Sequence, residues 1–83
     1  MDWKLSLGEE HLVCWQMSYE MGSFMTALWD AMAKADGDNF IRLAKAFPDD
    51  VMALKRYRYE AGYWDGVIAR WKARFTVSNE SSQ

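Results

Sequence analysis

The amino-acid sequence predicts an all-α fold: a compact bundle of four to five helices in a single domain. Apolar residues recur at spacings of three and four along most of the chain, which places them on one face of a helix. Helix-starting and helix-ending residues divide this pattern into short segments, and no segment alternates convincingly as a strand would. The length of 83 residues corresponds to one domain. We expect the helical domain to span residues 1–76.

The first helical segment begins at a capping box, because Ser6 is followed three residues later by Glu9. An apolar row then runs at helical spacing through Val13, Met17, Met21, Met25, Leu28, Met32 and Ala35, with a second row of Leu12, Trp15 and Tyr19 beside it. Gly22-Ser23 interrupts the pattern. Either the helix breaks there and Ser23 caps the second half, or the glycine lets another helix approach closely.

Asp36-Gly37-Asp38-Asn39 marks the next boundary. We expect Gly37 to take the left-handed conformation that ends a helix, and Asp38 or Asn39 to cap the short helix that follows. Its inner face comprises Phe40, Leu43, Ala44 and Phe47. Pro48 then ends this helix and opens another, since proline and the acids behind it favour a first turn.

Ala61-Gly62 separates that helix from a last one, whose apolar stripe comprises Trp64, Ile68, Trp71 and Phe75. Residues 77–83 are polar and lack a helical period, so we expect them to form a disordered C-terminal tail.

The charge is unevenly distributed. The net charge is −2, but residues 1–39 carry two lysines against seven acids and residues 40–83 carry eight basic residues against five acids. The small net charge gives no overall attraction to nucleic acid or membranes. The uneven distribution would steer a charged partner or pair two copies head to tail, unless the opposite charges meet within the monomer.

The single cysteine, Cys14, excludes an internal disulfide and fits a reducing cytoplasm. We expect no signal peptide and no membrane span, because the longest stretch without a charge, residues 21–29, is far too short. These features predict a cytoplasmic protein.

The stretch KRYRYEAGYW at residues 55–64 is the main candidate for a binding surface. On a helix, Tyr57 and Trp64 point inward, while Lys55, Arg56, Tyr59 and Tyr63 form a rim. Arginine and tyrosine are common at protein interfaces and also suit phosphates and bases. The alternative is an ordinary helix at the edge of the core. The expected partner-binding residues are Arg56, Arg58, Tyr59, Tyr63, Arg70 and Arg74.

A second candidate surface is acidic and comprises Glu9, Glu10, Glu20 and Asp30, which we expect on the outer face of the first helical segment. Such a surface would mimic nucleic acid toward a basic cleft.

No pattern in the sequence indicates catalysis. His11 and Cys14 lie three residues apart without a third member for a metal site or a catalytic dyad. The methionines follow the core stripe, and there is no phosphate loop or nucleophile elbow. We therefore expect no enzyme activity, no metal site and no cofactor.

The segment from residue 19 to residue 64 resembles a family of small hypothetical proteins from bacteriophages and prophages. The resemblance is carried by Tyr19 to Leu28, Ala35-Asp36, Leu43 to Ala46, Phe47-Pro48-Asp49-Asp50-Val51 and Gly62-Tyr63-Trp64. It implies a non-enzymatic accessory protein that binds a host protein, with inhibition of a bacterial defence system as the leading role, as anti-CRISPR proteins do. The alternatives are a nucleic-acid-binding regulator that uses the basic C-terminal half, and a virion or assembly protein in a homo-oligomer.

Overall fold

The structure, a computed structural model, describes residues 4–81 and contains five helices. They are α1 (Leu7–Met17), α2 (Ser23–Lys34), α3 (Gly37–Ala46), α4 (Pro48–Tyr59) and α5 (Tyr63–Ser81). No strand occurs within this part of the chain, and the predicted all-α fold is confirmed.

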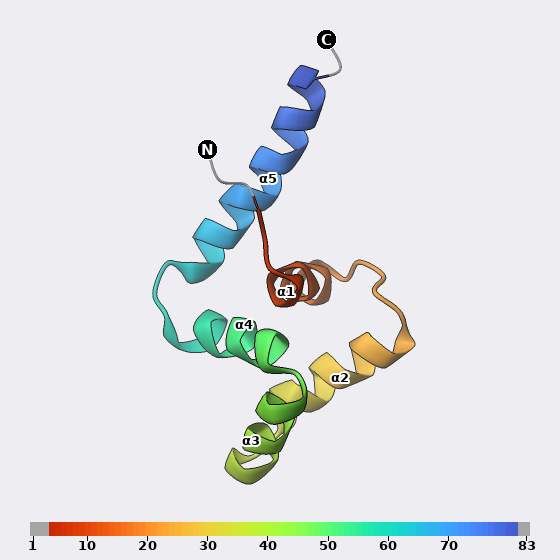
Figure 1. Cartoon of the computed structure of the whole chain (residues 1–83), viewed down its shortest axis with the longest axis vertical. Helices are drawn as coiled ribbons and strands as arrows, with labels where there is room; N and C mark the ends of the chain where they lie inside the picture. The colour runs from red at the N-terminus through yellow and green to blue at the C-terminus, as the bar shows by residue number, and fades with distance from the viewer. Residues whose placement is uncertain (1–3, 82–83) are drawn as a thin grey trace.

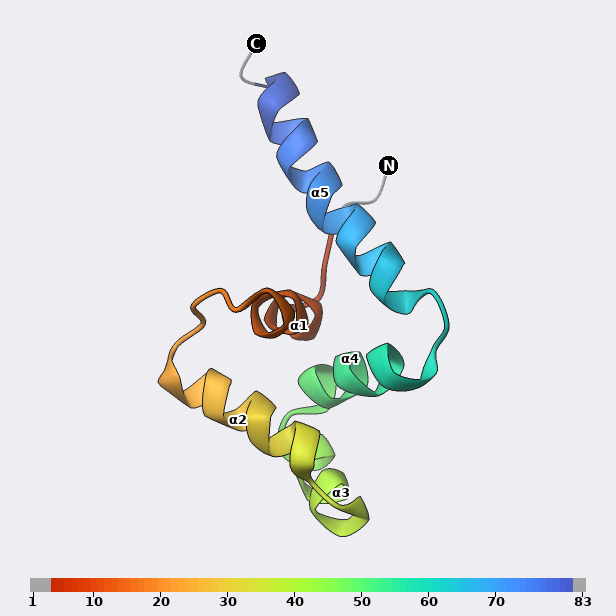
Figure 2. The same cartoon turned by 180° about the vertical axis from the view of Figure 1, so that it is seen from behind.

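Helices α1 and α4 pack against each other in the middle of the molecule (Figures 1 and 2). Helix α3 packs against α4, and α2 lies on the same side of the body as α3. Helix α5 touches α1 and α4 and then extends away from them, which contributes to the elongated dimensions of 50 × 28 × 19 Å. Within the described part of the chain, no helix is both long enough and apolar enough to cross a membrane.

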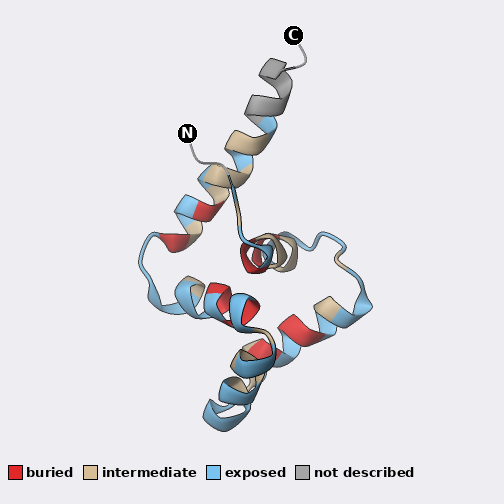
Figure 3. Cartoon of the chain, viewed as in Figure 1, coloured by how far each residue is buried: buried red, intermediate tan, exposed pale blue. Residues whose placement is uncertain are grey.

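The core lies where α1, α2 and α4 meet (Figure 3). Its fully buried side chains are Leu12 and Val13 of α1, Trp29 and Met32 of α2, Leu54 of α4 and Val67 of α5. Burial of a side chain of this size contributes about 1.5–3 kcal/mol to stability. The core therefore holds α1, α2 and α4 together and fixes only the first half of α5.

The crossing of α1 and α4 depends on a glycine. The Gly8 amide donates to Asp49 Oδ2 at 2.7 Å, and a Cβ on Gly8 would lie only 2.6 Å from the Asp49 carbonyl carbon. Three residues further along α1, His11 Nδ1 lies 2.9 Å from Asp50 Oδ1. The first turns of the two helices thus touch backbone to backbone, an approach that any side chain at residue 8 would obstruct.

Two predicted helix starts are confirmed. Ser6 Oγ accepts from the Glu9 amide at 3.1 Å, and the Glu9 carboxylate accepts from the Ser6 amide at 3.0 Å, which completes the capping box of α1. Pro48 occupies the first turn of α4 and is followed by Asp49 and Asp50, where negative charge favours the helix dipole.

The first helical segment is broken, as one of the two alternatives for Gly22-Ser23 proposed. The break starts earlier than expected, because Ser18 takes a left-handed conformation with φ 58° and ends α1. Gly22, with φ 88°, precedes α2, and no side chain caps this helix, so the cap predicted at Ser23 is wrong. Because α1 ends at Met17, the side chains of Met17 and Tyr19 leave the predicted core row and are exposed.

The boundary before α3 also differs from the prediction. Asp36 caps α3 by accepting from the Asn39 amide at 3.0 Å, and Gly37 is the first residue of the helix rather than a left-handed end. Asp36 lies two residues before Asp38, the first of the predicted caps, and has the spacing that a cap requires to the third amide of the helix. Asp38 and Asn39 therefore lie inside the first turn of α3.

Helix α5 continues to Ser81, past the expected end of the domain at residue 76. No glycine or proline follows Gly66 to stop the helix. Residues 82–83 of the predicted tail lie outside the described residues.

Candidate functional site

The end of α4 presents a group of polar and aromatic side chains that we call the α4 tip: Lys55, Arg56, Arg58 and Tyr59. Ala53 and Leu54 of the same helix are buried, so the α4 tip faces solvent. Tyr59 is 78% exposed, so most of this large aromatic residue is accessible to solvent. Of the four residues predicted to form a rim, Lys55, Arg56 and Tyr59 are exposed.

Both arginines of the α4 tip are held in place. Arg56 donates from Nε and Nη2 to the two Glu60 carboxylate oxygens, at 2.8 and 3.1 Å. These bonds raise the pKa of Arg56 and lower the pKa of Glu60. Arg58 donates from Nη2 to the Ala33 carbonyl oxygen at the end of α2, at 2.6 Å. Side chains fixed before binding lose less conformational entropy when a partner arrives.

A shallow hollow of about 360 Å³ adjoins the α4 tip at the turn into α5. Tyr57 and Trp64 line it and pack edge to face with their ring centroids 5.7 Å apart. Gly62, with φ 80°, makes the turn, a conformation that a residue with a side chain adopts at a cost. The α4 tip therefore combines an exposed ring with an adjacent concave surface.

Tyr63 does not belong to this exposed rim, which corrects the prediction. Its side chain is buried, with 6% exposure, and its hydroxyl donates to Glu9 Oε2 at 2.7 Å. Burial, the hydrogen bond to Glu9 and the charge of Glu9 raise the pKa of Tyr63 far above its usual value. The Arg56 guanidinium lies 4.4 Å from the centre of the Tyr63 ring and covers it.

Arg70 and Arg74 are turned toward α1 rather than toward a free basic face. Arg70 donates from Nη1 and Nη2 to Glu9 at 3.1 and 2.9 Å, and from Nη1 to the Lys4 carbonyl oxygen at 3.0 Å. Arg74 donates to Glu10 Oε1 at 3.0 Å and lies 5.2 Å from the centre of the Trp71 ring. Opposite charges of the two chain halves thus meet within the monomer at these two pairs.

Glu9 is the centre of this network, which corrects its assignment to an outer acidic surface. Its residue is 7% exposed, and its carboxylate accepts from the Ser6 amide, the Tyr63 hydroxyl and Arg70. Burial alone would raise the pKa of Glu9, but the hydrogen bonds from Arg70, Ser6 and Tyr63 and the charge of Arg70 outweigh it and lower the pKa. Glu9 therefore holds α5 against α1.

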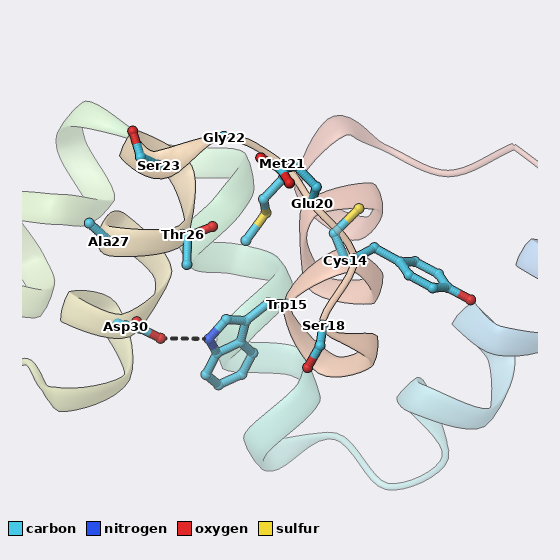
Figure 4. A pocket seen from close by; sticks show the side chains of 11 residues that line it. Cys14, Trp15, Ser18, Glu20, Met21, Gly22, Ser23, Thr26, Ala27 and Asp30 are labelled. Carbon is cyan, nitrogen blue, oxygen red and sulfur yellow. Dashed lines mark hydrogen bonds between the residues drawn. The ribbon is translucent and has the colours of Figure 1, made fainter.

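Glu20 and Asp30 are exposed, as predicted, and both line a hollow between α1 and α2 (Figure 4). Asp30 Oδ1 accepts from Trp15 Nε1 at 3.0 Å. The four predicted acidic residues therefore do not form one surface: Glu9 and Glu10 pair with α5, while Glu20 lies in the connection between α1 and α2 and Asp30 lies on α2.

His11 and Cys14 are not paired with each other. His11 contacts Asp50, and burial together with the charge of Glu10 raises the pKa of the half-buried Cys14 thiol, which leaves less of the nucleophilic thiolate at neutral pH. In the described part of the chain, no three side chains of histidine, cysteine, aspartate or glutamate gather as a metal site would require.

The buried Glu9–Tyr63–Arg70 network was not predicted from the sequence. The signal was present: Tyr63, Val67, Arg70 and Arg74 are spaced by four, three and four residues and so share one face of α5. Because Val67 is an apolar member of that row, the row predicts a side of α5 that faces the core.

No protein-family model matches the chain, and searches of the curated proteins and of the solved structures found no significant match.

Proposed function

We propose that this chain is a small non-enzymatic protein that acts by binding another protein through the α4 tip. The observation that supports this proposal is the 78% exposed Tyr59 at the same end of α4 as Arg56 and Arg58, two arginines that already make hydrogen bonds within the chain. Tyrosine and arginine dominate the energetically important positions of protein interfaces. The adjacent hollow beside Tyr57 and Trp64 would receive a side chain of the partner.

The proposal includes the role that the resemblance implies: a phage accessory protein that binds a host protein and inhibits a bacterial defence system. Expression of the chain in a bacterium that carries such a system should restore plaque formation by a restricted phage. The Tyr59→Ala variant should fail to do so.

A pull-down of the tagged protein from bacterial lysate, with and without nuclease, tests the binding proposal directly. We expect a stoichiometric host protein that survives nuclease treatment. Tyr59→Ala should weaken its capture at least about tenfold, equivalent to about 1.4 kcal/mol. Ile41→Ala is the matched control, because Ile41 is also an exposed apolar residue, at 56%, but lies on α3. Equal loss with both variants would contradict a specific role for the α4 tip.

A nucleic-acid-binding regulator is the less favoured alternative. Its basic face would need Arg70 and Arg74, and both are paired with acids of α1. Affinity for nucleic acid that falls steeply as salt rises would support this alternative. The other alternative, a virion or assembly protein, predicts a defined homo-oligomer in sedimentation experiments.

A further inference from the structure

A hollow of about 640 Å³ lies where the chain leaves α1 and returns as α2 (Figure 4). Its volume lies within the range of binding pockets in proteins. Figure 1 places this connection and the turn from α4 to α5 on opposite sides of the body. The hollow is therefore separate from the α4 tip.

One wall of the hollow is apolar and fixed. The Trp15 indole donates to Asp30 Oδ1 and packs against the buried Trp29, with ring centroids 5.6 Å apart. The side chains of Met21 and Thr26 face the same space as Trp15 (Figure 4). The ring is thus held from two sides, and an aliphatic chain placed in the hollow would lie against indole and thioether.

The charge in the hollow has one sign. Glu20 and Asp30 line it, and none of its lining residues is basic. The Glu20 carboxylate makes no hydrogen bond or ion pair within the described residues, whereas Glu9, Glu10, Asp50 and Glu60 each face a cationic or histidine partner. Asp30 uses one oxygen for Trp15. The hollow therefore combines an aromatic wall with uncompensated negative charge.

We propose that this hollow is a docking site for a basic side chain, arginine or lysine, from an exposed segment of a partner protein. The aliphatic stem of the side chain lies along Trp15 and Met21, and its charged end lies between Glu20 and Asp30. A cation beside an indole face gains additional attraction. The charge complementarity and the aromatic wall select this occupant over an acidic or a wholly apolar one. This site goes beyond the binding proposed for the α4 tip and does not depend on it.

Titration of the ¹⁵N-labelled protein with the tripeptide acetyl-Ala-Arg-Ala-amide, followed by NMR, tests the site. We expect saturable shifts at Trp15 Nε1–H and at the amides of Glu20 and Thr26, and weaker binding as salt rises. The same peptide with norleucine in place of arginine should give no such shifts. Binding of the two peptides with equal strength would overturn the proposal, because the hollow would then recognise only apolar surface.

Two double variants with the same change in net charge separate the site from general electrostatics. Glu20→Gln with Asp30→Asn should weaken peptide binding about fivefold, as expected for two partly exposed charge pairs. Asparagine at residue 30 keeps an acceptor for Trp15. Asp38→Asn with Asp65→Asn removes two exposed acids elsewhere and should leave binding unchanged. Equal weakening by both double variants would refute the site.

The single variant Glu20→Gln keeps the test decisive if the double variant folds poorly, since Glu20 has no partner to lose among the described residues. We expect it to weaken binding about twofold to threefold. Sedimentation of the free protein tests whether a second copy of the chain occupies the hollow. Self-association that Glu20→Gln abolishes would show that it does. That result would overturn the assignment of the hollow to a different partner protein.

Discussion

Replacement of Glu9 by glutamine should destabilise the protein by about 3 kcal/mol. The glutamine fits the same volume but carries no charge, and an NH₂ group takes the place of one carboxylate oxygen. Arg70 would keep its two donors and Tyr63 its hydroxyl, now facing a neutral group with one acceptor oxygen. A hydrogen bond to a charged group contributes about 1.5–3 kcal/mol, and one between neutral groups about 1 kcal/mol.

The size of the effect is worked from the two bonds that Arg70 donates, because they join opposite charges. Each of the two Arg70 bonds loses about 1 kcal/mol of charge assistance, and a donor that faces the NH₂ group loses about 1 kcal/mol more. An 83-residue domain is stable by roughly 4–12 kcal/mol in total. A loss of this size should therefore shift the midpoint of unfolding in urea clearly without changing the slope of the transition.

Glu10→Gln is the matched control for this experiment. It makes the same substitution at the next residue, but Glu10 and Arg74 form a single bond with side chains 39% and 30% exposed. A pair this exposed contributes about 0.5 kcal/mol. A comparable loss of stability in both variants, or a loss below about 0.5 kcal/mol for Glu9→Gln, would refute the reasoning that burial makes Glu9 the stronger link.

The pH dependence provides a second test of Glu9. Its pKa is lower in the folded protein than in the unfolded chain, so its contribution is complete above the unfolded value, about 4.3, and disappears as the pH falls through the folded value. The stability difference between the wild-type protein and Glu9→Gln should be constant near neutral pH and shrink in acid. A difference that grows as the pH falls would contradict the assigned sign.

Three further predictions concern the backbone. Gly8→Ala should lower the free energy of unfolding in urea by about 2–3 kcal/mol, because the new Cβ overlaps the Asp49 backbone. The control Gly66→Ala, with open space around residue 66, should be neutral or stabilising. Similar effects of the two variants would refute the close approach of α1 and α4. Ser18→Gly should raise stability by about 0.5 kcal/mol in thermal unfolding, because it relieves the left-handed conformation, and a decrease would contradict this. Asp36→Ala should lower stability by about 1 kcal/mol through loss of the α3 cap; an unchanged unfolding midpoint would contradict the cap.

The sequence was sufficient to predict the helices that begin at strong local signals. The capping box at Ser6 and the proline at residue 48 act within a single turn, and both start helices in the structure. The end of α1 at Ser18 had no such signal, since neither glycine nor proline stands there. The apolar row continued through the break because Met21 packs against the core from the connection itself.

The candidate binding residues were harder to predict, because helical spacing shows which residues share a face but not what that face meets. Tyr59 and Tyr63 are separated by four residues but belong to different helices, with the turn at Gly62 between them. That turn sends Tyr63 into the interior and leaves Tyr59 in solvent. The pairing of Glu9 with Arg70 spans 61 residues, a distance at which local patterns carry no information.

The order of the helices along the chain has a consequence for synthesis on the ribosome. Helix α1 is made before its partners: Gly8 and His11 bind acids 41 and 39 residues later, and the partners of Glu9 in α5 follow 54 and 61 residues later. At about 5–20 residues per second, translation of this interval takes roughly 3–12 s. For most of that time α1 lacks α4, the helix against which it mainly packs. The apolar face of α1 thus waits for its partners until translation has passed through α4 and into α5.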